Sequence, residues 1–292
     1  MLWLTWRQHR AQALVTAGLL AVLGVLLLIN GLGARNLVDH AGLLPLQQHF
    51  KAMGDLVDWL ALAPAAIGLF WGAPVLAKEF ERGTHKLAWT QSVSLRRWLV
   101  IKLSVLGGAV TLAGLALGTM ISLWLSSYAG TQYADRFASI GKFVISGILP
   151  AAWWLFAFAT GVAAGAVFRK MLPAIALTLA MVVPTILGLF IVNARAYYAT
   201  PEQAIVTVEG PMSIPEDWMI QDSYPVDAAG QPVPNFCPAE QPCPRRADSR
   251  ILFLYQPPSR YWRFQWTEAA ALFAATLALG AVAVTRTLRG RT

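Results

Sequence analysis

The chain has 292 residues, of which 57% are hydrophobic and only 13% charged, and its mean hydropathy is +0.53. An ordinary soluble domain is about one quarter charged, so this composition excludes a soluble globular protein and indicates one that crosses the membrane several times. The formal net charge of +8 comes without a basic tail, and most Lys and Arg residues lie beside apolar segments, which argues against a nucleic-acid partner.

Six segments are long and apolar enough to cross about 30 Å of hydrocarbon as helices, which takes about 20 residues each. They are residues 12–30, 57–77, 99–127, 143–168, 171–193 and 267–285. Helices are predicted because lipid offers backbone groups no partners, and because the segments lack the alternating pattern of a membrane barrel. The expected fold class is therefore an all-α integral membrane protein with six transmembrane helices.

The first segment follows a basic start, "WRQHR", as the core of a signal peptide does. Its apolar part runs from Ala13 to Ile29 and is longer than the about 7 to 15 residues of a typical signal-peptide core. We therefore expect an uncleaved first helix.

The distribution of Lys and Arg predicts the orientation, because cytoplasmic loops of membrane proteins are enriched in them. If the N-terminus is cytoplasmic, the inner segments hold twelve, including Lys78 and Arg169, whereas the two short outer loops hold four. We therefore expect a multi-pass protein of the cell membrane with both termini in the cytoplasm. Arg260 and Arg263, near the outer end of the last segment, do not follow this rule.

Few charges lie inside the six segments. Asp58 and Glu268 are expected near the outer ends of their helices, and no ionisable residue is expected at mid-membrane, which argues against an ion-coupled transporter. Prolines that bend these helices are either hinges or ordinary features of membrane helices, and they are Pro64, Pro74, Pro150, Pro173 and Pro184. Glycines of the third and fourth helices, among them Gly161 and Gly165 in a GxxxG motif, predict close helix packing.

Residues 194–263 are rich in Pro and acidic residues and predict a small extracellular domain of turns and short strands between helices 5 and 6. The two cysteines of the chain, Cys237 and Cys243, both fall there. An oxidising space favours a disulfide between two cysteines this close in sequence. Zinc is the alternative, but two Cys without a nearby His supply half of a ligand set, so we expect no metal site.

A charged stretch, "AKEFERGTHKLAWTQSVSLRRWLVIKL", separates the second and third segments and is expected on the cytoplasmic side. Its first part, "KEFERGTHKLAW", can form a short helix with Leu76, Phe80, Gly83 and Leu87 along one face. Ser94 is placed to cap the third helix. Two interpretations fit this pattern, an element that passes force from a cytoplasmic partner and an interfacial helix in the lipid headgroups.

The same stretch closely resembles the loop between the second and third helices of ABC transporter permeases of the type-two, exporter-like class. The shared pattern is an acidic pair, Gly-Thr, a small polar stretch, an Arg and a Lys-Leu helix start. The segments "WLTWRQHRAQAL" and "YQPPSRYWRFQWTEAAALF" look like the same actinobacterial-style permeases. The resemblance implies a coupling helix that meets a cytoplasmic ABC ATPase subunit through Glu79, Glu81, Arg82, Gly83 and Thr84.

The resemblance also implies an assembly and a task. Two permease chains, identical or different, would form the substrate path in the lipid bilayer, and ATP hydrolysis on the partner would switch it between inward- and outward-facing states. Export of an amphipathic small molecule, antibiotic or peptide is expected by analogy with the class. The chain lacks a G-x-x-x-x-G-K-[ST] phosphate loop, so no cofactor is expected on it, and ATP and Mg would bind the ATPase subunit.

Two other classes of function stay open. An accessory or sensory membrane subunit would bind through its extracellular domain without transporting anything. A membrane-embedded enzyme is disfavoured, because neither H-E-x-x-H nor G-x-S-x-G occurs and no catalytic residues are expected. The expected organisation is helices 1–5 in residues 1–193 with a coupling loop at 78–98, the extracellular domain in 194–263, and the sixth helix with a cytoplasmic tail in 264–292.

Overall fold

The protein has a mostly helical fold in the computed structural model, which describes residues 2–40, 43–81, 94–207, 215, 217–227, 229–231 and 250–289. Within these ranges, six helical stretches are long and apolar enough to cross a membrane. They are Trp6–Val38, Leu44–Glu81, Arg96–Ser126, Leu149–Phe168, Met171–Val192 and Pro258–Arg289. The prediction of six helices long and apolar enough to span a membrane is thereby confirmed. The first, second and sixth of them extend beyond the predicted apolar segments at both ends.

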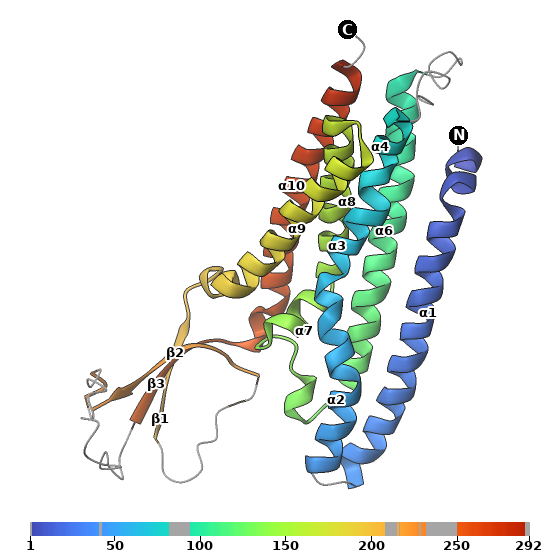
Figure 1. The fold of residues 1–292 in the computed structure, drawn as a ribbon. Coiled ribbons are helices and arrows are strands. Elements are labelled where there is room, and N and C mark those ends of the chain that lie inside the picture. The colour runs from blue at the N-terminus through green and yellow to red at the C-terminus, as the bar shows by residue number, and fades with distance from the viewer. Residues whose placement is uncertain are drawn as a thin grey trace.

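The helices in chain order are α1 (Leu2–His40), α2 (Leu43–Trp59), α3 (Ala63–Ile67), α4 (Ala73–Glu81), α6 (Leu95–Ser126), α7 (Ile140–Ile145), α8 (Leu149–Phe168), α9 (Met171–Val192) and α10 (Tyr261–Arg289). Short 3-10 or π segments are η1 (Leu60–Leu62), η2 (Gly68–Gly72), η3 (Gln132–Ala134), η4 (Ala194–Tyr197) and η5 (Pro258–Arg260). The first turn of α1 and the last turn of α10 lie at the same end of the bundle (Figure 1).

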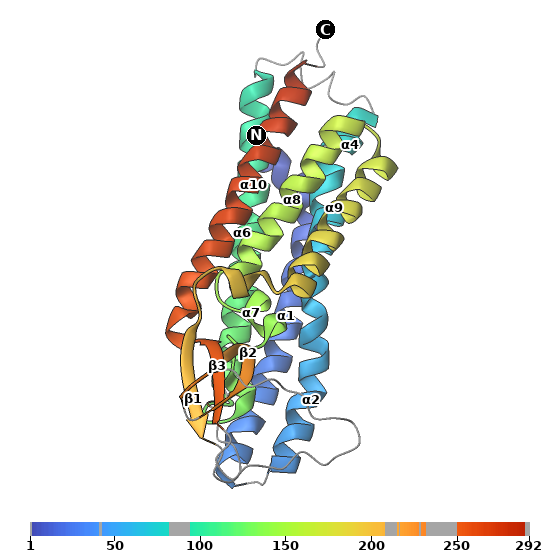
Figure 2. The same ribbon diagram turned by 90° about the vertical axis from the view of Figure 1, so that its left-hand side faces the viewer.

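The helix α8 forms the centre of the bundle, because it contacts α4, α6, α9 and α10. Of its most apolar window 78% is buried within the chain, against 6% for the corresponding window of α1. Its large side chains Trp153, Trp154 and Phe158 are buried between these helices. By contrast, α1 lies at one edge, beside α6 and α2 (Figures 1 and 2).

The second membrane span changes helix type before each of two prolines. It passes from α2 through the 3-10 segment η1 to Pro64, and from α3 through the π segment η2 to Pro74. Proline has no N–H, and its ring clashes with the carbonyl four residues earlier, so a wider π turn before Pro74 relieves the clash. The carbonyl of Phe70 loses its usual donor in this way, and the side-chain amide of Gln12 on α1 donates to it instead at 2.9 Å.

The predicted fourth segment, residues 143–168, consists of two helices instead of one. Between α7 and α8, Gly147 has a φ of 64°, a left-handed conformation that favours glycine. Gln265 of α10 stabilises this break, because its Oε1 accepts from the N–H groups of Ile148 at 3.1 Å and Leu149 at 3.2 Å. The prediction was wrong here because both helices are apolar and the hydropathy pattern continues across the break.

The predicted close packing at glycines is confirmed at Gly114, Gly118, Gly161 and Gly165, whereas a Cβ atom on Gly108 of α6 would meet nothing within 4 Å. A Cβ atom on Gly161 of α8 would lie 2.5 Å from backbone atoms of both Ala73 and Gly68. A Cβ atom on Gly118 of α6 would lie 2.1 Å from the carbonyl of Gly147. Since backbone atoms cannot give way as a flexible side chain can, these glycines set the distances between the helices.

The segment after α9 contains a three-stranded antiparallel sheet in the order β1–β3–β2. Its strands are β1 (Glu202–Thr207), β2 (Met219–Val226) and β3 (Arg250–Gln256). The sheet lies at the end of the bundle opposite to the first turn of α1 and extends sideways past the helices (Figure 1). The expected short strands are thus present, whereas Cys237 and Cys243 lie outside the described residues and their disulfide stays a prediction.

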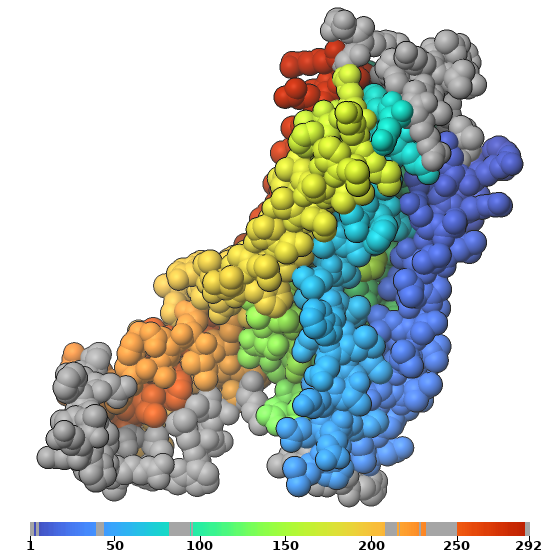
Figure 3. Space-filling view, in the orientation of Figure 1, coloured from blue at the N-terminus to red at the C-terminus, as the bar shows by residue number. Residues whose placement is uncertain are grey.

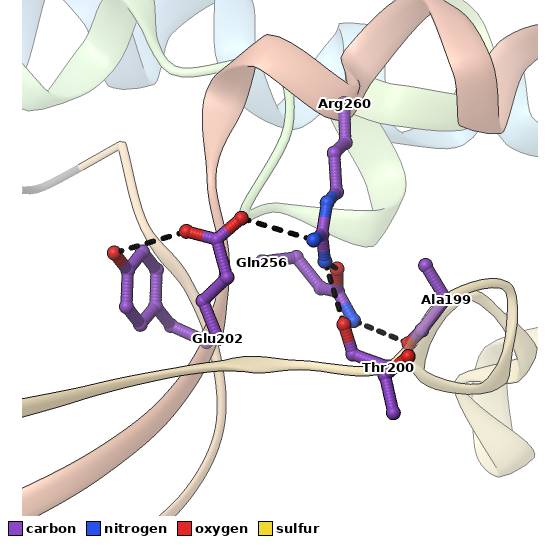
Figure 4. Close-up of polar contacts among 6 residues, drawn as sticks. Ala199, Thr200, Glu202, Gln256 and Arg260 are labelled. Carbon is purple, nitrogen blue, oxygen red and sulfur yellow. Dashed lines mark hydrogen bonds and ion pairs between the residues drawn. The ribbon is translucent and has the colours of Figure 1, made fainter.

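Arg260 joins this sheet to the start of α10 (Figure 4). Its guanidinium donates to the carbonyl of Thr200 at 2.7 Å, to Oε1 of Glu202 at 2.9 Å and to Oε1 of Gln256. The amide of Gln256 in turn donates to the carbonyl of Ala199 at 2.7 Å. Arg260, which does not follow the positive-charge rule, therefore has a structural role at the base of the sheet.

Candidate coupling site at the end of the second membrane span

The last turn of α4 carries the part of the predicted coupling element that the structure describes. Glu79 and Glu81 lie in this turn. Arg82, Gly83 and Thr84 lie outside the described residues, so their part in the coupling element stays a prediction.

The predicted loop 78–98 is shorter in the structure at both ends. Residues 78–81 continue α4 without a break, so the expected separate helix does not begin at Lys78. The helix α6 begins directly after Ser94, whose carbonyl accepts from the N–H of Trp98 at 3.1 Å. Ser94 therefore occupies the predicted N-cap position, but its side chain makes no capping hydrogen bond. The connection between the two spans consists of residues 82–94.

Glu79 forms an ion pair with Lys102 of α6. The Nζ atom of Lys102 lies 3.0 Å from Oε1 of Glu79 and also donates to the carbonyl of Val75 at 3.4 Å. Only 3% of the Lys102 side chain and 18% of the Glu79 side chain are exposed. Because a charge this deeply buried requires a partner, the pair connects the ends of the second and third spans. Lys102 is not among the predicted site residues, although a lysine inside an apolar segment is itself a signal.

Glu81 contacts the first residue of α9. Its Oε2 atom accepts from the N–H of Met171 at 3.3 Å, at a helix end where unpaired N–H groups favour a negative charge. Next to it, the guanidinium carbon of Arg169 lies 5.3 Å from the centre of the Phe80 ring. Arg169 ends α8 in a left-handed conformation, with a φ of 54°. The last turn of α4 therefore contacts the turn that joins α8 to α9.

These contacts connect the end of α4 to three other membrane helices at one place. Glu79 contacts α6 and Glu81 contacts α9. The helix α4 also packs closely on α8, because a Cβ atom on Gly165 would lie 3.0 Å from the backbone nitrogen of Ala77. Among the described residues, no group of three or more His, Cys, Asp or Glu could hold a metal ion.

A family model described as ABC-2 membrane transporter related matches residues 17–192, which is more than half of the chain. The chain belongs to this family. The resemblance of the charged stretch to type-two ABC transporter permeases is thereby confirmed. In the same comparisons, no curated protein and no solved structure matches the chain.

In this ABC-2 membrane transporter related protein, the matched residues run from α1 to the end of α9. They include most of the first five spans and the contacts of Glu79, Phe80 and Glu81 described above. The sheet and α10 follow after the match. The family is a membrane component of ABC transporters, so the matched part of the chain corresponds to a permease and not to a catalytic subunit.

A second polar cluster of this ABC-2 protein lies where α8, α10 and the start of the sheet segment meet. Glu268 of α10 is 5% exposed and accepts from Nε1 of Trp153 at 3.0 Å and from the hydroxyl of Tyr198 at 3.3 Å. Arg195, also buried, donates to the carbonyl of Phe137 at 2.6 Å. Burial lowers the pKa of Arg195 to about 10 and raises the pKa of Tyr198, so the arginine is charged and the tyrosine neutral at pH 7. The sequence predicted only that Glu268 lies near the outer end of its helix, and its partners could not be predicted because they come from separate segments.

Proposed function

We propose that this protein is the membrane-spanning permease subunit of an ABC transporter, powered by a separate cytoplasmic ATPase subunit. The observation that carries the proposal is the family match over residues 17–192. Export of an amphipathic small molecule, antibiotic or peptide is the expected task, and a second permease chain, identical or different, completes the transport path.

The proposed orientation has both termini in the cytoplasm. The first turn of α1 and the last turn of α10 lie at one end of the bundle (Figure 1). The turn with Arg169 and Lys170 and the end of α4 with Lys78 belong to the same end, which carries the excess of positive charge typical of the cytoplasmic side. The sheet is then on the outer side.

The geometry of α4 supports a mechanical role for residues 82–94. In the proposed cycle, closure of the ATPase subunits on ATP moves this connection. The last turn of α4 follows, and its contacts through Glu79, Phe80 and Glu81 carry the displacement to α6, α8 and α9.

The test begins with isolation of the tagged chain from its native membrane and identification of any co-purified subunit that carries an ATP-binding phosphate loop. ATP-dependent uptake of solutes into membrane vesicles that contain the complex then measures transport. Gly83→Trp places a bulky side chain in the proposed interface, and Glu81→Lys reverses a charge beside it. Asp55→Lys, an exposed acid at the other end of the bundle, is the matched control for charge reversal.

Both test variants are expected to insert normally but to lose most of the co-purified ATPase and of its stimulated hydrolysis, whereas the control retains both. In the headgroup interpretation Glu81→Lys loses its contact with Met171 but should leave ATPase binding unchanged, and a basic charge near an anionic membrane surface contributes about 1 kcal/mol. If both variants keep full ATPase binding and stimulation, the coupling assignment is wrong. If no ATPase accompanies the unmodified chain, the permease proposal itself fails.

A further inference from the structure

A polar cavity of about 430 Å³ lies between α1, α4 and α6, at the end of the bundle that holds the coupling site. Its polar lining consists of Gln8, His9, Gln12, Lys78, Glu79 and Lys102. Within it, the His9 ring and the Gln12 amide are 2.7 Å apart, and Glu79 is paired with Lys102. Since these two charges offset each other, exposed Lys78 gives the lining one net positive charge.

An apolar groove of about 770 Å³ continues from this cavity towards the middle of the membrane. The two share Ala11 and Gln12 in their linings, and the groove then runs between α1 and the second span. The polar side chains of its wall are already bonded, since Gln12 donates to the carbonyl of Phe70 and Thr16 accepts from Nε1 of Trp71 at 3.1 Å. The wall therefore presents an apolar surface.

The groove is open to the side. Val15 and Leu19 of α1 are 63% and 68% exposed, and Phe70 on the opposite wall is 60% exposed. Figure 3 shows α1 and the second span side by side along the same face of the molecule. Both walls belong to helices long and apolar enough to cross the membrane, so in the proposed orientation the side opening faces lipid. A molecule dissolved in the adjoining leaflet can then reach the groove directly.

We propose that the cavity and the groove form one binding site for an amphiphile with an anionic head and a single alkyl tail, taken from the leaflet next to the coupling site. In lipid the tail is held in the groove by close van der Waals packing and not by a hydrophobic driving force. The charge of the head decides which amphiphile binds, and Lys78 favours a carboxylate or a phosphate. A cationic or neutral head lacks this attraction.

This site indicates the substrate class of the proposed permease. That the bound amphiphile is the transported cargo rests on that proposed function. Binding itself does not, because it requires neither the ATPase subunit nor ATP. The position next to Glu79 and Lys102 brings the head into contact with the ion pair that connects α4 to α6. In this proposal, binding of the head changes the surroundings of the Glu79–Lys102 ion pair at the coupling site.

The experiment uses the full chain in nanodiscs of phosphatidylcholine and a hexadecyl phosphate probe with a photoreactive diazirine in its tail. Labelled peptides are located by mass spectrometry, and competition is measured with hexadecyl phosphate, hexadecyltrimethylammonium and inorganic phosphate. Lys78→Glu reverses the charge of the head site, with Lys170→Glu, an exposed lysine at the same end, as its control. Val15→Trp fills the groove, with Leu14→Trp, an exposed neighbour that does not line it, as its control.

Labelling is expected on α1 and on the second span, with displacement by hexadecyl phosphate but not by the cationic amphiphile or by inorganic phosphate. Lys78→Glu and Val15→Trp should each weaken binding by about tenfold or more, and both controls should stay within about twofold. Three results would overturn the proposal. They are labelling of α9 and α10 as strong as that of α1, equal competition by the cationic amphiphile, and an equal loss of binding in the control variants. Cross-links between two copies along the groove, in place of probe labelling, would show that a second chain covers it.

The two proposals can fail separately. If the probe binds as expected but no ATPase accompanies the chain, the site stands and the permease function fails. If the complex transports solutes but the probe does not bind the groove, the permease function stands and this site is wrong.

Discussion

Gln12 of α1 donates a hydrogen bond of 2.9 Å to the backbone carbonyl of Phe70 in the second span. The usual helical donor to this carbonyl would be the N–H of residue 74, which is a proline. A carbonyl that loses a donor in hydrocarbon is unfavourable, and here a side chain from the neighbouring helix supplies one. The proline of the second span is therefore compensated by α1, and the two spans depend on each other for their stability.

Replacement of Gln12 by leucine is expected to destabilise the contact between α1 and the second span by about 1 to 2 kcal/mol, because it leaves the Phe70 carbonyl without this donor. Pro74→Ala restores a backbone donor, so the loss caused by Gln12→Leu should be smaller in that background. A double-mutant cycle of thermal unfolding in detergent measures this coupling. Strict additivity of the two changes would contradict the assigned role of Gln12.

Lys102→Met should destabilise the protein by about 3 kcal/mol, because it removes the buried cation that pairs with Glu79. The double variant Lys102→Met with Glu79→Leu removes both charges and should recover most of that loss. The apparent unfolding midpoints of the three proteins give the comparison. A double variant as unstable as Lys102→Met would show that packing, and not the ion pair, determines stability at this position.

Gly161→Ala should destabilise the bundle by about 1 to 3 kcal/mol, because the added methyl group meets backbone atoms of α4 and η2 at 2.5 Å. Gly108→Ala provides the control, since a Cβ atom there meets nothing within 4 Å. An alanine in an open helical position is neutral or slightly stabilising. Equal unfolding midpoints for the two variants would argue against close packing of α8 on the second span.

Arg260→Ala should loosen the base of the sheet by about 1 to 2 kcal/mol, because three acceptors lose their donor and two of these contacts are partly exposed to water. Hydrogen exchange of the β1 amides should rise, with little change in the central helix α8. Arg260→Lys should rescue only part of the effect, since a lysine cannot span the same acceptors. Arg263→Ala, an exposed arginine three residues later, should leave the exchange of β1 unchanged.

The two cysteines provide a test of the predicted topology. If Cys237 and Cys243 are paired on the outer side, thiol labelling of the denatured protein should succeed only after reduction. Labelling without a reductant would count against the bond and against the outer location of this segment. Cys237→Ser is the control, because its remaining thiol should react without reduction.

Much of the architecture followed from sequence alone, for reasons that belong to the membrane. A span needs a minimum length of apolar residues, so six spans could be counted without knowledge of their contacts. The charged stretch from Ala77 to Leu103, with one segment near each end of the chain, resembles one class of permease, and the family match confirms that class. Local chemistry also placed Ser94 at the start of α6.

The tertiary structure alone decided which spans lie inside the bundle and which polar groups meet. The apolar window of α1 has a mean hydropathy of 2.5 and is 6% buried, whereas that of α8 has 1.7 and is 78% buried. Hydropathy cannot separate them, because a membrane helix is apolar whether it faces lipid or other helices. The pairs of Gln12 with Phe70 and of Glu79 with Lys102 join residues far apart in the chain. Such pairs form only when helix packing, set here by glycines such as Gly161, brings those residues within hydrogen-bonding distance.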